Sequence, residues 1–365
     1  MKKNFMMGMF SLAALAMTSC SMNDEISSAA KDQEVVFGTY VGRDAQTKAH
    51  VEDLTGLQGH GFGVYAYYTG QDKYNCTDDP ANFMRDQHVQ YSGSQWVYAP
   101  VKYWPNNIGD MISFFAYAPY GDTNITPAAK DVTGDPYVDF VVNQTVEEQV
   151  DLLYSSTPNI DKTKPALGET IEFNFAHALS RIGFQVQVQP DLKNGDVTGT
   201  DDDDTQGNGS LAANTVVEVT NVELIGSFYK SGTLNLNGGS WTDVAASNET
   251  YTLTSEHFDN NVATQVLTGE QVLNNKDGYV MIIPKDETMT QQIKVTYTVT
   301  TTDTNLEGGN SVITNTITSE EFGIDFLQGK AYTFSLHLGL NSVKFTASVS
   351  DWVDGGDIAV NVPLN

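Results

Sequence analysis

The side chains best suited to catalysis or metal binding are few in this chain and widely separated. It has two cysteines and six histidines among 365 residues. No HExxH, CxxC or G-x-S-x-G sequence occurs, so the spacing of a zinc site and that of a nucleophile elbow are both missing. Cys76 lies in a turn-rich stretch without a neighbouring histidine, which is typical of an unreactive thiol. The sequence therefore predicts no metal site and no cofactor, whereas the missing motifs alone leave an enzyme open, since a carboxylate pair of a glycosidase would meet only in the fold.

Cys20 is the exception, because its position predicts a modification. Two lysines precede an apolar stretch, Phe5–Met17, that is too short to span a bilayer, as in a secretory signal peptide. The sequence Met-Thr-Ser-Cys that ends at Cys20 resembles a lipobox, whose cysteine is joined to diacylglycerol and becomes the new N-terminus. We expect a signal peptide over residues 1–19 and a lipidated tether over residues 20–33; an ordinary signal peptide is the alternative.

The chain is strongly acidic, and this excludes one class of partner. It has 46 Asp and Glu against 19 Lys and Arg, a formal net charge of -27. A field of this sign repels phosphate backbones, so we expect no nucleic-acid partner. The run Asp201–Asp204 lacks the alternating ligands and the closing Glu of a calcium loop. We therefore interpret residues 191–214 as a solvated loop.

The pattern of apolar residues predicts an all-β protein. Short runs rich in Val, Ile, Thr, Tyr and Phe are separated by clusters of Gly, Asn, Asp and Pro, and almost no stretch keeps a helical period over three turns. Val146–Tyr154 is the one plausible helical region. The length favours two cores, so we expect tandem antiparallel β-sandwiches over residues 34–178 and 179–365. The expected strands are Glu34–Val41, Gly61–Tyr68, Gln95–Tyr98, Met111–Tyr117, Ile171–Phe175, Ile182–Val188, Val216–Ile225, Gly232–Leu236, Glu249–Leu253, Tyr279–Pro284, Gln292–Thr301, Ser311–Ser319, Ala331–Leu338 and Val343–Val349.

Six blocks of sequence, in order along the chain, resemble those of the fimbrillin family of Bacteroidota. They are Gly61–Tyr67, Trp96–Pro105, Ile112–Pro119, Asp151–Tyr154, Phe175–Ile182 and Phe326–Thr333. The resemblance implies two transthyretin-like β-sandwich domains and a structural subunit of a cell-surface fimbria, or pilus, that supports adhesion and is not an enzyme. It also implies export as a lipoprotein to the cell outer membrane and assembly with other fimbrial subunits by protease-triggered strand exchange. A host or bacterial surface ligand is a further possible partner.

Two basic residues after the first expected strand are candidates for the maturation cut. Arg43 and Lys48 lie in the polar stretch Gly42–His50, of the kind that proteases reach. In the family, a cut at such a loop removes the first strand. We favour Arg43, which is closer to the strand, with Lys48 as the alternative; an uncut loop is the other interpretation.

The C-terminus has the pattern of a strand with one apolar face. Ile358, Val360, Val362 and Leu364 alternate with smaller or polar residues, and a Gly-Gly pair precedes them. The segment resembles a donor strand that completes a neighbouring subunit. Alternatively, it is an edge strand of its own domain, where Pro363 would be tolerated.

A surface glycan-binding lipoprotein is the alternative function, since it would share the lipobox, the acidity and the sandwiches. Trp96 and Trp104 would then form an exposed aromatic platform, whereas packing in a core is the default for such residues. His177 lies between apolar residues and is expected to be a hydrogen-bonded core residue rather than a ligand.

Overall fold

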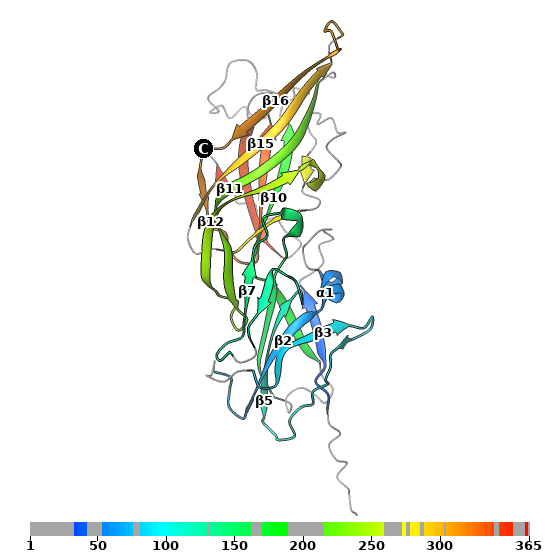
Figure 1. Ribbon diagram of the computed structural model, residues 1–365, viewed down its shortest axis with the longest axis vertical. Helices are drawn as coiled ribbons and strands as arrows, with labels where there is room; N and C mark the ends of the chain where they lie inside the picture. Colours follow the sequence, from blue (N-terminus) through cyan, green and yellow to red (C-terminus); the bar gives the residue numbers. More distant parts are fainter. Residues whose placement is uncertain are drawn as a thin grey trace, which may run out of the picture.

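The computed structural model describes most of the chain from Gln33 onward (Figure 1). The described residues are 33–41, 53–75, 81–129, 132–161, 170–188, 215–258, 272–274, 278–284, 288–302, 304–338, 343–352 and 362–363. Strands make up most of their secondary structure, which confirms the predicted all-β class. Among these residues, no helix has both the length and the apolar character needed to cross a bilayer.

The first sheet is built from the N-terminal half and curls until its two edges meet. Its strands, in spatial order, are β1 (Phe37–Val41), β9 (Ile171–His177), β8 (Leu153–Asp161), β5 (Met111–Ala118), β2 (Phe62–Gly70), β3 (Met84–Tyr91) and β4 (Trp96–Val97). The edges are joined by a hydrogen bond of 3.1 Å from Trp96 Nε1 on β4 to Thr39 Oγ1 on β1. The space inside the curl is filled by an apolar core rich in aromatic residues, among them Phe62, Phe114 and Phe173.

The central strands β2 and β5 are buried on both faces. Phe114 and Phe115 are consecutive and both are fully buried; Phe114 belongs to the core inside the curl and Phe115 to a second core outside it. Helix α1 (Leu54–His60), capped by the Asp53 carboxylate, contributes Leu57 to the inner core. A strand that is buried on both faces needs a second layer of structure, and strands β6 (Ile125–Pro127) and β7 (Tyr137–Val141) supply it.

Two further sheets, built mainly from the C-terminal half, pack face to face. One contains β13 (Val272–Asn274), β10 (Ser180–Val188), β18 (Lys330–Leu338), β19 (Val343–Asp351) and β20 (Val362–Pro363), with β14 (Val280–Ile282) also beside β10. The other contains β16 (Asn310–Thr318), β15 (Met289–Thr302), β11 (Thr215–Asn235), β7 (Tyr137–Val141) and β6 (Ile125–Pro127), with β12 (Trp241–Thr254) beside β11 and β17 (Phe322–Ile324) beside β15. Phe184 and Phe334 of the first of these sheets share one core with Leu224 and Val295 of the second, as in a sandwich.

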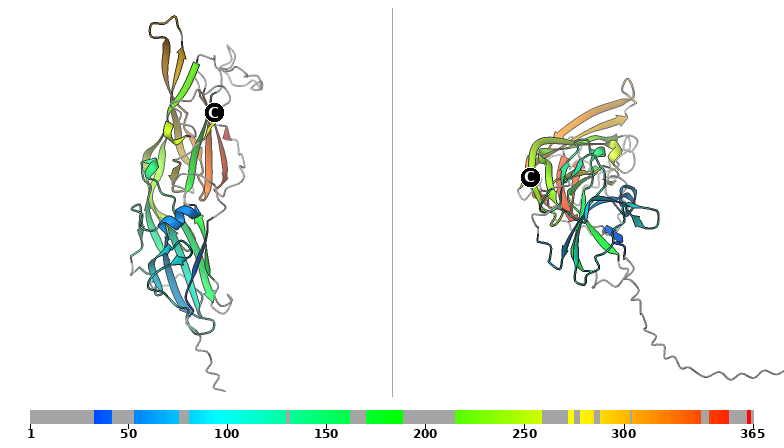
Figure 2. Two further views of the ribbon diagram at one scale, coloured as in Figure 1. Left: turned by 90° about the vertical axis from the view of Figure 1, so that its right-hand side faces the viewer. Right: turned by 60° about the horizontal axis from the view of Figure 1, so that its bottom comes forward.

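Strand β11 runs along the long axis of the molecule and touches both halves of the chain (Figures 1 and 2). Its first part pairs with β15, and its last part, Ser231–Asn235, pairs with β7. Val138 and Phe140 of β7 pack in the same core as Phe115 of the first sheet. Backbone hydrogen bonds therefore join strands from before and after position 178, the predicted domain boundary. The boundary itself stays a prediction.

The structure differs from the predicted strands in several places. The expected strands Val216–Ile225 and Gly232–Leu236 fall on the single strand β11, which ends at Asn235, and strands β3, β6, β7, β8, β13 and β17 were not predicted. Within Val146–Tyr154, only Val146–Glu148 forms a 3₁₀ turn, and β8 begins at Leu153. A second 3₁₀ turn, Ser255–His257, follows β12. Most neighbouring strands are antiparallel, but β1 pairs with β9, and β10 with β18, in parallel.

Candidate assembly site

Strand β1 buries one of its two faces in the inner core. Val35, Phe37 and Val41 are between 1% and 8% exposed, whereas Val36 and Tyr40 are 40% and 53% exposed. This alternation is that of a strand with one face toward a core and the other toward solvent. The strand is thus part of the core although it lies at the edge of the sheet.

Phe37 is the main apolar contact of β1. Its ring contacts four others, with centroids 5.3 to 6.3 Å apart and mostly in edge or tilted arrangements; the partners are Phe62, Tyr98, Phe114 and Phe173. Such contacts add to the free energy of burying the ring itself. Without β1, this aromatic cluster would face water.

The backbone of β1 is held on both sides. On one side it pairs in parallel with β9, from Phe37 opposite Ile171 to Val41 opposite Phe175. On the other side lie residues 96–104, which we call the strap. Val35 N–H donates to the Lys102 carbonyl at 2.9 Å, and the Tyr98 hydroxyl donates to the Val35 carbonyl at 2.8 Å. A strand that took the place of β1 would find backbone partners on both sides.

Trp352, which precedes the C-terminal segment, is held in place by charged and aromatic side chains. The Trp352 ring lies parallel to the His177 ring, with centroids 4.1 Å apart, and His177 Nδ1 lies 2.9 Å from the buried Asp151 carboxylate. The Arg181 guanidinium lies 5.4 Å from the Trp352 ring and 4.6 Å from the ring of Tyr279. This confirms the predicted hydrogen bonding of His177, whose side chain is 12% exposed and so lies at the margin of the core. The stack fixes the point from which the C-terminal segment departs.

Part of the predicted donor segment can be placed. Val362 and Pro363 form β20, which pairs with Ala347 and Thr346 at the edge of the chain's own sheet. Ile358, Val360 and Leu364 lie outside the described residues. The pairing concerns a single unassembled chain, so the choice between a donated strand and an edge strand stays open.

The other predicted site residues also lie outside the described part of the chain. These are Cys20, Arg43 and Lys48. The described chain ends its first strand at Val41, two residues before Arg43. Lipidation at Cys20 and cleavage at Arg43 or Lys48 therefore stay predictions.

The two tryptophans of the glycan-platform alternative are core residues. Trp96 and Trp104 are 9% and 5% exposed. Trp96 packs edge-on against Phe62 at 4.9 Å, and Trp104 packs against Phe114 at 6.0 Å. They offer no flat exposed surface on which a sugar ring could stack.

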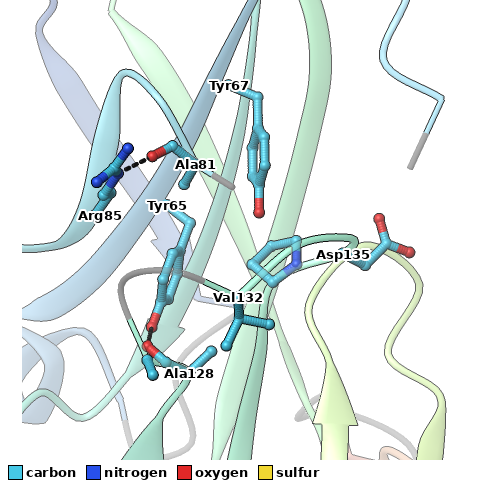
Figure 3. A pocket seen from close by; sticks show the side chains of 9 residues that line it. Tyr65, Tyr67, Ala81, Arg85, Ala128, Val132 and Asp135 are labelled. Carbon is cyan, nitrogen blue, oxygen red and sulfur yellow. Dashed lines mark hydrogen bonds between the residues drawn. The ribbon is translucent and has the colours of Figure 1, made fainter. Parts of the chain in front are cut away.

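A partly open pocket beneath the first sheet is too small for a ligand (Figure 3). Its volume is about 10 Å³, room for about one water molecule. Two polar groups on its wall are already bonded, since the Tyr65 hydroxyl donates to the Ala128 carbonyl and Arg85 Nε donates to the Ala81 carbonyl. Among the described residues, no group of three or more His, Cys, Asp and Glu side chains could hold a metal ion.

An open hollow of about 550 Å³ lies over the outer face of β7, β11 and β12. Two of the three carboxylates that line it are engaged within the protein, because Thr233 Oγ1 donates to Asp139 at 2.6 Å and Asn235 Nδ2 donates to Asp135 at 3.1 Å. We assign it no ligand. Strand β1 is thus the best candidate for an assembly site. We call the space that it fills between β9 and the strap the groove.

Comparisons with known proteins agree with this emphasis on assembly. The family model described as fimbrillin-like matches residues 47–352. The chain is 27% identical to the fimbrium subunit Fim1C of Phocaeicola vulgatus, over 96% of this chain and 97% of that one. A crystal structure of a fimbrial protein from Bacteroides vulgatus superimposes with a TM-score of 0.63 at 20% identity, over 87% of this chain and 99% of that one. The chain belongs to the fimbrillin-like family.

Proposed function

We propose that this chain is a fimbrial subunit that reaches the cell surface as a lipoprotein, loses β1 to a protease, and then accepts a strand from a neighbouring subunit. The observation that carries the proposal is the position of β1: it fills an aromatic core while lying at a seam between β9 and the strap. The relative Fim1C is itself described as a fimbrium subunit. Acylated Cys20 would hold the precursor at the outer membrane until the cut.

The C-terminal segment matches the positions that β1 occupies. Val35, Phe37 and Val41, on β1 and just before it, are buried in the inner core with the half-buried Thr39 between them, and the apolar positions of the C-terminal segment are 358, 360, 362 and 364. Both sets have the two-residue spacing of one face of a strand, so the C-terminal segment could present four apolar side chains to the same core. At about 1.5 to 3 kcal/mol for each buried side chain, the replacement would contribute about 6 to 12 kcal/mol before the cost of ordering the segment.

Cleavage is needed because an attached strand outcompetes a free one. While β1 is covalently joined to the chain, its effective concentration at the groove is on the order of millimolar. A neighbour's segment at lower concentration cannot displace it. A cut after Arg43 or Lys48 turns β1 into a separate peptide that is diluted once it dissociates.

The first experiment identifies the N-terminus of assembled subunits. Fimbriae purified from cells should contain chains that begin at Asp44 or Ala49, and the matched variants Arg43→Gln and Lys48→Gln should show which residue is cut. Filaments built from chains that still begin at Cys20 would contradict the proposal.

The second experiment separates a donated strand from an edge strand. Deleting Asp357–Asn365 should leave a folded monomer that no longer polymerises once β1 has been removed. If the segment instead completes its own sheet, the same deletion will cause a large loss of thermal stability in the monomer. Circular dichroism and electron microscopy of the same samples give both readouts.

A further inference from the structure

The hairpin of β15 and β16 projects beyond the rest of the molecule at one end of its long axis, at the top of Figure 1. Within the part of the chain that the structure describes, β16 pairs only with β15. Its outer edge therefore carries backbone donors and acceptors on which no described strand lies. Nine residues, Asn310–Thr318, form this edge.

Natural proteins protect such edges, and the other described edges follow that rule. Short strands, prolines, charged side chains and bulges all hinder pairing with another chain. Strand β6 ends in Pro127 and β20 contains Pro363, whereas the long edge strand β12 carries Asp243 and Glu249 together with register shifts. Strand β16 has no charged residue, no proline and no glycine, in a chain with 46 acidic residues.

Apolar side chains stand exposed on both faces of β16. Val312 is 62% exposed and Ile313 is 57% exposed. As consecutive strand residues they point to opposite faces of the sheet, so each face carries one exposed apolar side chain at this end of the hairpin. An unprotected edge with apolar residues on both faces is suited to strand addition.

We infer that β16 is a self-association surface, which pairs in antiparallel fashion with β16 of a second copy of this chain around a two-fold axis near Thr314. The net charge of -27 makes two copies repel wherever charged surfaces meet. Strand β16 carries no charged residue, so two copies that approach each other along this edge meet the least electrostatic repulsion. Val312 and Ile313 lie within two residues of the axis, so those of both copies would gather at the centre of the joint.

The acidic residues that flank β16 define the length of the contact. Glu307 precedes the strand, and Glu320 and Glu321 follow it. With the axis at Thr314, the end of β16 that leads to Glu320 and Glu321 of one copy approaches the β15–β16 turn of the other, which carries Glu307, so like charges gather at both ends of the joint. Association should therefore strengthen as salt screens this repulsion. The contact uses neither β1 nor the C-terminal segment and is independent of strand donation.

Cysteine cross-linking of the uncleaved, soluble chain tests the pairing directly. The chain begins at Ser21 and carries Cys76→Ser, so each variant has one cysteine. Opposed Cα atoms in antiparallel strands lie about 4.5 to 5.5 Å apart, within reach of a disulfide. Thr314→Cys should form a disulfide-linked dimer under mild oxidation, whereas Ala246→Cys on the exposed edge of β12 should stay monomeric. If single cysteines from 312 to 316 give no more dimer than Ala246→Cys, the inference is overturned.

Sedimentation equilibrium gives a second, non-covalent readout. The unmodified soluble chain should dimerise more tightly in 0.5 M than in 0.05 M sodium chloride, and Glu321→Gln should raise the affinity at the lower salt concentration. Val312→Lys should weaken the dimer at least tenfold while the circular dichroism spectrum is unchanged, since this side chain is exposed. A chain that stays monomeric at about 100 μM in high salt, or a dimer unaffected by Val312→Lys, would refute the pairing.

Discussion

Replacing Phe37 with alanine measures how much the first sheet depends on β1. The Phe37 side chain is 3% exposed and contacts four aromatic rings. Truncating a buried phenylalanine costs about 3 to 5 kcal/mol, because the apolar surface is lost and the cavity that remains closes only in part. We expect a decrease of this size in the free energy of unfolding of the uncleaved chain. Urea titration followed by tryptophan fluorescence reports on it, since Trp96 and Trp104 lie in the same core.

Tyr40→Ala is the matched control. Tyr40 lies on the same strand as Phe37 but is 53% exposed. Substitutions at exposed positions usually change stability by about 0.5 kcal/mol or less. If Phe37→Ala costs under about 1 kcal/mol, or no more than Tyr40→Ala, then β1 does not hold the core closed and our account of the groove is wrong.

Three further predictions address other parts of the chain. Cys20→Ala should abolish palmitate labelling and leave an unprocessed precursor; equal labelling of both proteins would rule out the lipoprotein assignment. Burial raises the pKa of Tyr98 to about 12, so the stability conferred by its protonated hydroxyl, which donates to the Val35 carbonyl, is present below pH 10 and lost as pH rises toward 12. The difference in stability between the wild type and Tyr98→Phe, about 1 kcal/mol near neutral pH, should therefore shrink over that interval in urea titrations. A Cβ on Gly63 would lie 2.3 Å from Tyr117 Cε1, so Gly63→Ala should cost about 1 to 3 kcal/mol; an unchanged melting temperature would contradict this close packing.

Much of the fold could be predicted because alternation and turn residues are local signals. Strands such as Met111–Ala118 and Lys330–Leu338 are rich in aromatic and β-branched residues, and both were found within one residue of the structure. Strand β3, Met84–Tyr91, was missed because five of its eight residues are polar or charged and only two are buried. The residues of β3 have little β-propensity of their own. The strand forms because its neighbours β2 and β4 supply backbone hydrogen bonds.

Contacts between distant residues could not be predicted from the sequence. The stack of His177 on Trp352 joins residues 175 positions apart, and no local pattern connects them. The pairing of β7 with β11 is likewise a property of the topology. For the candidate site, the family resemblance implies that the first strand is removed, but the strap on its far side became visible only in the structure.

The pairing of β7 with β11 has a mechanical consequence for a filament under tension. These strands lie along the long axis of the molecule (Figure 1), and five residue pairs, from Ser231 opposite Val141 to Asn235 opposite Tyr137, join them. A force applied along that axis would load these hydrogen bonds in shear, so they would have to break together rather than one after another. The β7–β11 pairing therefore resists separation of the two halves of the chain along the long axis, in addition to the covalent connection near Ala178.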